Sequence, residues 1–154
     1  MPSKWFSESE IVVPQSSYVS TPLPRALLIG GSAHQLLVEA LVGVRCVDFA
    51  TITDICELIW NDPEQRIEVV NVLSSAMRHD NDVTKQLRAT TVAHELLYDA
   101  GARRAMYETP GMIQTLARLQ HGGDQFNQGP AREAVRMLAS EVMRRLLEEF
   151  TFHL

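Results

Sequence analysis

The chain has 154 residues, 45% hydrophobic and 21% charged, a composition typical of a soluble globular domain and unlike collagenous or disordered chains. Its 19 acidic side chains outnumber 14 lysines and arginines, and this net charge of −5 argues against a protein that coats nucleic acid. The longest apolar stretches span only a few residues, as at 26–29, whereas a membrane span needs about 20. We therefore expect one domain that does not cross a bilayer.

The first 24 residues contain four prolines, six serines and no helical period, so we expect residues 1–24 to be an extended or mobile lead-in. They lack an apolar segment of signal-peptide length, so we expect a cytoplasmic protein. A single domain is expected over 25–150, with a short tail at 151–154. Cys46 and Cys56 have no metal-ligand spacing and are expected to be reduced thiols in or near the core.

Helical spacing of apolar residues begins after Ser32, which is a good N-cap, and ends near Gly43. A second short helix is expected from Thr51, because an aspartate three residues later resembles a capping box, and Trp60 at its end is expected near the core. The third helix starts at the pair Asp62-Pro63 and runs to Met77, before the polar residues at 79–82 break it.

The fourth helix carries a narrow apolar stripe from Ala89 to Ala100, and Gly101 is placed to close it in the left-handed conformation. We expect it to be the longest and most buried element. A short helix follows over 102–108, the pair Thr109-Pro110 opens the next one, and a polar loop covers 122–129. The last helix is expected from Pro130 to about residue 149.

No segment alternates with period two, so the chain is predicted to be all-α, with about seven helices of roughly 8 to 18 residues. Short helices with one apolar stripe each must stack on their sequence neighbours. This requirement favours a right-handed superhelix of antiparallel pairs over a four-helix bundle. No repeat of fixed period is visible.

We find no motif of a catalytic nucleophile or a phosphate-binding loop, and predict no enzyme activity and no cofactor. His94-Glu95 resembles the start of a zinc-protease motif, but residue 98 is a tyrosine where the motif needs histidine, so no metal site is expected and a solvated or interface histidine is favoured. Other charged residues are expected on solvated faces, namely Asp54, Glu57, Glu64, Glu68 and the pairs Arg103-Arg104 and Arg144-Arg145.

One basic cluster lies around the loop between the third and fourth helices, formed by Arg78, His79, Lys85 and Arg88. A flat array of donors there would meet the phosphates of a phospholipid. The alternative is an exposed polar turn, since the acids at 80 and 82 cancel much of the charge.

Several strings resemble the ENTH/VHS superfamily of membrane-traffic adaptor domains over about residues 32–149. The Ile-Gln-Thr-Leu string at 113–116 with Leu-Gln at 119–120 is similar to epsin-type ENTH domains. Residues 54–59 resemble the second helix of that family, and residues 131–136 resemble the helix start after its last loop. The loop 121–129 resembles the tepsin-like branch in its aspartate and closing glycine, but it lacks the proline of that branch.

Epsin-type domains bind inositol phospholipids through a basic N-terminal helix and through bases on the first helix and on the loop before the fourth. Here Lys4 is the only lysine or arginine in residues 1–24, and the expected first helix has none. Of the three basic regions, only the loop before the fourth helix is therefore kept. The resemblance thus implies a non-enzymatic, tepsin-like domain of a coat accessory protein in vesicle transport. It implies a cytoplasmic protein, peripheral on trans-Golgi or vesicle membranes, that binds adaptor-complex or other trafficking proteins and at most weakly a phosphoinositide membrane.

Two alternatives stay open. The first is an epsin-like phosphoinositide-binding domain that uses the basic cluster in clathrin-coated vesicle formation. The second is a helical-repeat scaffold unrelated to coats.

Overall fold

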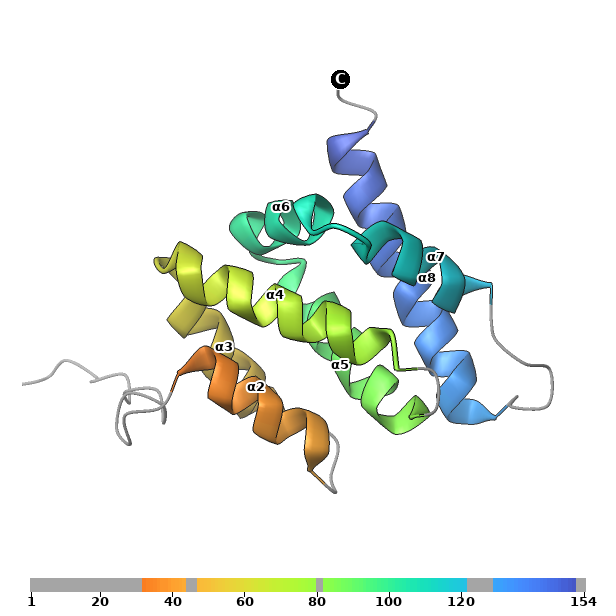
Figure 1. Cartoon of the computed structure of the whole chain (residues 1–154), viewed down its shortest axis with the longest axis horizontal. Helices are drawn as coiled ribbons and strands as arrows, with labels where there is room; N and C mark the ends of the chain where they lie inside the picture. The colour runs from red at the N-terminus through yellow and green to blue at the C-terminus, as the bar shows by residue number, and fades with distance from the viewer. Residues whose placement is uncertain (1–31, 44–46, 80–81, 122–128, 152–154) are drawn as a thin grey trace, which may run out of the picture.

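The computed structural model describes residues 32–43, 47–79, 82–121 and 129–151, and every regular element in these ranges is a helix (Figure 1). The prediction of an all-α chain with about seven helices is confirmed for this part of the chain. The expected lead-in at 1–24 and the polar loop at 122–128 lie outside the described residues. The helices are α2 (Ala33–Val42), α3 (Phe49–Trp60), α4 (Pro63–Met77), α5 (Val83–Leu96), α6 (Ala100–Glu108), α7 (Met112–Gln120) and α8 (Pro130–Phe150).

Side-chain caps fix most of the helix starts. In each case a short polar side chain accepts a hydrogen bond from a backbone N–H of the first turn, which would otherwise have no partner inside the helix. The predicted caps of α2 and α4 are confirmed. The capping residues are Ser32 for α2, Asp48 for α3, Asp62 for α4, Asp82 for α5 and Asp99 for α6.

The predicted start of the second helix was wrong by two residues. Asp48 caps α3, and its Oδ1 accepts a hydrogen bond of 2.7 Å from the backbone N–H of Thr51. Thr51 therefore lies inside the first turn of α3, whereas the sequence pattern predicted it to be the N-cap. The placement of Trp60 near the core was also wrong, since it is 61% exposed. The buried stripe of α3 ends at Ile59, and the next residue on a helix points about 100° away from it.

The end of the predicted fourth helix was wrong as well. The helix α5 ends at Leu96, and Asp99 begins α6 by accepting a hydrogen bond from the N–H of Gly101. Gly101 is therefore inside α6 and does not close α5. Because the chain turns at 97–99, α5 has only 14 residues, and the longest of the described helices is α8 with 21.

The left-handed glycine of this region is Gly111, with φ of 83°. It precedes α7, which starts at Met112, two residues after the predicted Thr109-Pro110 start. Thr109 instead ends α6, and the residue before a proline is disfavoured in helical conformation. A positive φ is accessible to glycine without steric cost, so Gly111 provides the sharp turn between α6 and α7.

Helices α4 and α5 lie at the centre of the molecule (Figure 1). Helix α4 packs on α2, α3, α5, α6 and α7, and α5 packs on α2, α3, α4 and α8. The predicted apolar stripe is confirmed from Ala89 to Leu96, with Ala89, Val92, Ala93 and Leu96 fully buried, but Ala100, its predicted last residue, is exposed and belongs to α6. Contacts thus form between helices that follow one another in the chain and also between helices two or three places apart in the element order. The buried residues form one continuous core through the described helices.

None of the described helices is both long enough and apolar enough to cross a membrane.

Candidate binding groove between α2 and α4

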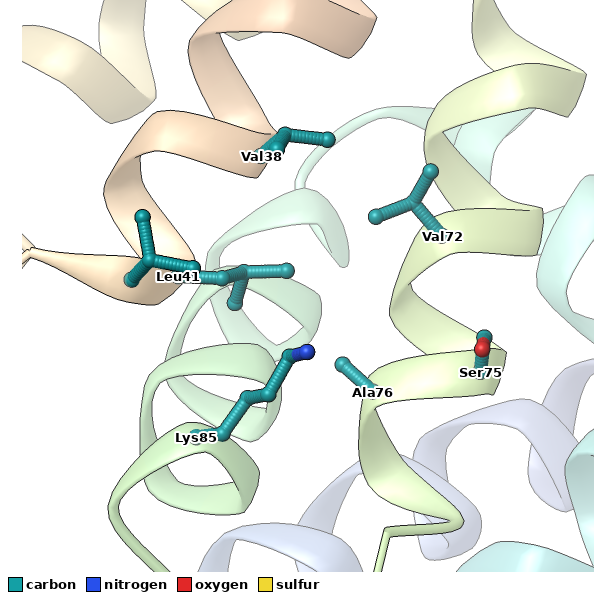
Figure 2. A pocket seen from close by; sticks show the side chains of 7 residues that line it. Val38, Leu41, Val72, Ser75, Ala76 and Lys85 are labelled. Carbon is teal, nitrogen blue, oxygen red and sulfur yellow. The ribbon is translucent and has the colours of Figure 1, made fainter. Parts of the chain in front are cut away.

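A shallow hollow of about 140 Å³ opens on the surface between α2 and α4, and we call it the α2–α4 groove (Figure 2). Its walls are largely aliphatic. The first turn of α5 adds one charged side chain. The lining residues are Val38, Leu41, Val42, Val72, Ser75, Ala76 and Lys85.

The walls follow from helical spacing. Val38 and Val42 on α2 are four residues apart, as are Val72 and Ala76 on α4, so each pair lies on one helix face. Leu41 and Ala76 are buried at the base of the groove, whereas Val38 is 40% and Val42 is 68% exposed. Apolar side chains beside a hollow that are left open to water are a frequent mark of a binding surface.

Lys85 reaches from α5 into the space between the two helices, as Figure 2 shows. Its position is set by the Asp82 cap, whose carboxylate accepts a hydrogen bond of 2.9 Å from the backbone N–H of Lys85. The side chain is half-buried, and no acidic group of the described residues forms a salt bridge with its ammonium. The groove therefore combines an apolar wall with one positive charge.

The four residues of the predicted basic cluster make different contacts in the structure. Arg88 lies one turn after Lys85 on α5, and its Nη1 donates to the backbone oxygen of Leu41 at 3.3 Å, which ties α5 to the end of α2. Arg78 lies on another face of α4, where its Nη1 donates to Ser74 Oγ at 3.0 Å and lies beside Gly111. His79 is exposed after the end of α4. Of the four residues, only Lys85 lines the groove.

The size and lining of the groove limit what it can bind. Its volume is well below the roughly 300–1,000 Å³ of typical small-molecule and cofactor sites. Within the described ranges no group of three or more histidine, cysteine or acidic side chains is placed to hold a metal ion. The arrangement suits an aliphatic side chain next to an anionic group.

Other charged residues form structural contacts. Arg103 was expected to be solvated, but its Nε pairs with Glu149 and its Nη1 donates to the backbone oxygen of Leu97 at 2.6 Å, so it fastens α6 to α8. Arg144 is half-exposed and pairs with Glu141 and Glu148 on its own helix. His94 is half-buried, with Nδ1 3.6 Å from Glu95 Oε2. The side chains of Glu57, Glu64 and Glu68 are exposed, as predicted.

The sequence reasoning missed the apolar walls of the groove. The signal was present, because Val38 and Val42 form a second apolar pair on α2, outside the stripe that points into the core. Because the predicted site consisted of charged residues only, these valines were not part of it.

Comparisons with protein-family models, curated proteins and solved structures find no significant match to this chain.

Proposed function

We propose that this chain is a non-enzymatic adaptor domain of the ENTH/VHS type, similar to the tepsin-like branch, and that it acts in vesicle transport mainly by binding other proteins. In this proposal its partners are adaptor-complex or other trafficking proteins on the cytoplasmic side of trans-Golgi or vesicle membranes. The short strings at 54–59, 113–120 and 131–136 support the family, and the contacts between helices two or three positions apart are compatible with a right-handed superhelical stack.

The observation that carries the binding role is the α2–α4 groove. Val38 and Val42 are exposed beside a hollow whose base is apolar, and burial of such surface on association is favourable by about 25 cal/mol per Å². Grooves between helices commonly take extended or helical peptides through matched apolar anchors.

Proximity labelling tests the proposal. The intact chain, fused to a biotin ligase, is expressed in cultured eukaryotic cells and compared with the free ligase. We expect adaptor-complex or other coat subunits to be enriched among the labelled proteins. An absence of coat and trafficking proteins from the enriched set would contradict the adaptor role.

A matched pair of variants tests whether the groove is used. Val42→Asp places a charge on the groove wall and should lower the labelling of the partners, whereas Met137→Asp should leave it unchanged. Met137 is a suitable control because it is 64% exposed on α8, which does not line the groove.

Lipid binding is the second candidate, and the proximity of Lys85 and Arg88 on successive turns favours it. Against it stand the aliphatic walls and the hydrogen bond that holds Arg88 to Leu41. The vesicle experiment in the Discussion separates the two candidates.

A further inference from the structure

We infer that the occupant of the α2–α4 groove is a short peptide segment of a partner protein that carries aliphatic side chains and one carboxylate, with the carboxylate paired to Lys85. This inference rests on the proposed protein-binding function and specifies the chemistry of the partner at the same groove.

The aliphatic part of the occupant follows from the walls. Val38, Val42 and Val72 have no polar atoms in their side chains, and Leu41 with Ala76 closes the base. Ser75 and Lys85 are the polar side chains of the lining, so a ligand that is polar throughout would lose its hydration along the aliphatic walls without gaining hydrogen bonds there, which is unfavourable. With a volume of about 140 Å³ the hollow takes side chains and not a whole folded element.

The carboxylate follows from Lys85. The residue is half-buried and lines the apolar hollow, and its ammonium forms no salt bridge with an acid of the described residues. The capping carboxylate of Asp82 accepts a hydrogen bond from the backbone N–H of Lys85 and forms no salt bridge with the Lys85 ammonium. An anion brought in by a partner would meet a positive charge that has no salt bridge within the described residues, and such charge complementarity favours association.

A single carboxylate fits better than a polyanion. A phosphorylated inositol headgroup needs several donors around each phosphate, but the groove offers Lys85 as its only cationic side chain among the described lining residues. Arg88 is engaged at Leu41, and Arg78 is on another face of α4. The net charge of −5 on the chain also disfavours a strongly acidic partner.

Selection from a phage-displayed library of random peptides on the intact chain tests this inference. We expect the selected peptides to share two or more aliphatic residues near an aspartate or glutamate. A parallel selection on Lys85→Glu should replace the acid with lysine or arginine while keeping the aliphatic residues. Selection on Met137→Asp should give the same peptides as the unmodified chain.

The affinity of the best selected peptide, measured by fluorescence anisotropy, gives the size of the effect. We expect Lys85→Glu to weaken binding on the order of tenfold and Lys85→Met to weaken it less, since reversal adds repulsion to the lost attraction. Val42→Asp should also abolish most binding. Circular dichroism melting of each variant shows whether it is folded, which we expect because these side chains are at the surface.

Three results would overturn the inference: no enriched sequence, an enriched sequence without an acid, or binding that is indifferent to both Lys85→Glu and Val42→Asp. Displacement of the peptide by phosphatidylcholine vesicles that contain an inositol bisphosphate, but not by plain phosphatidylcholine vesicles, would assign the groove to a lipid headgroup instead. The adaptor role is judged separately by the coat proteins found in proximity labelling, so either proposal can fail while the other stands.

Discussion

Gly101 shows how one residue can have a role that its place in the sequence conceals. Its position after an apolar stripe suggested a helix end, yet it lies in the first turn of α6. A Cβ there would lie 2.7 Å from Cζ of Arg66. The Nη2 of Arg66 donates to the backbone oxygens of Ile59 and Trp60 and so satisfies the carbonyl end of α3. The glycine leaves room for this guanidinium.

We therefore expect Gly101→Ala to destabilise the protein by about 1 kcal/mol in urea denaturation. The methyl group displaces Arg66 and weakens two hydrogen bonds from a charged donor, which outweighs the gain of about 1 kcal/mol in helix propensity. In an Arg66→Ala background the same substitution has nothing to displace, and there it should be neutral or stabilising. An equal effect in both backgrounds would show that Arg66 and Gly101 are not coupled.

Cys56 allows a second test at the residue scale. Burial, followed by the negative charges of Asp99, Glu95 and Glu57, raises the pKa of its thiol from 9.0 to about 11. Only the thiolate reacts with alkylating agents, so a shift of this size lowers the reactive fraction at pH 8 by about 100-fold. The cysteine is therefore expected to be inert in the native protein.

The rate of iodoacetamide labelling checks this in a Cys46→Ser variant, where Cys56 is the remaining thiol. The folded protein should react about two orders of magnitude more slowly than the same variant in denaturant, and its rate should still rise between pH 9 and 10.5. A rate that levels off near pH 9 would mean that the thiol titrates as if exposed.

Among the elements, α5 connects the two sides of the molecule. It packs on α2, α3 and α4 through one face and on α8 through another. Its small residues Ala89 and Ala93 allow close approach, and Leu96 fills the space near its end. Gln86 is fully buried on the same helix, where it donates to the backbone oxygen of Met77 and accepts from Arg132 of α8. Such an element should be sensitive to truncation.

Leu96→Ala should cost roughly 2 to 5 kcal/mol of the free energy of unfolding, because it leaves a cavity at a fully buried position. Met137→Ala on the exposed face of α8 should cost less than about 0.5 kcal/mol. Chemical denaturation of both variants gives the comparison. A loss below about 0.5 kcal/mol for Leu96→Ala would mean that α5 is peripheral, which would refute the central position given to it here.

For the whole molecule, the charge distribution bears on whether a protein or a membrane is the expected partner. Each base near an anionic leaflet contributes about 1 kcal/mol, but the groove has Lys85 alone and the chain carries a net charge of −5. Direct attraction to phosphoinositides is therefore expected to be marginal.

Liposome flotation measures the binding of the chain to phosphoinositide membranes. We expect the intact chain to stay in the bottom fraction with vesicles that contain an inositol bisphosphate, at 150 mM salt and also at low salt. Flotation that disappears in high salt and on Lys85→Glu would favour the epsin-like alternative. Met137→Asp serves as the control for nonspecific changes.

The sequence by itself determined the helical class, most helix positions and the buried stripe of α5, because these depend on local spacing and on capping residues such as Ser32 and Asp62. It misplaced boundaries where two acceptable caps compete, as at Asp48 and Thr51, since local propensities there differ little.

Only the tertiary structure decided the roles that depend on distant partners. The fit of Gly101 to Arg66, the burial of Gln86 against Arg132 and the contact of Arg103 with Glu149 join residues 35 to 46 positions apart. The candidate groove also depends on residues that are far apart in the sequence. Its walls come from α2 and α4 and its charge from α5, so no single stretch of sequence contains the site.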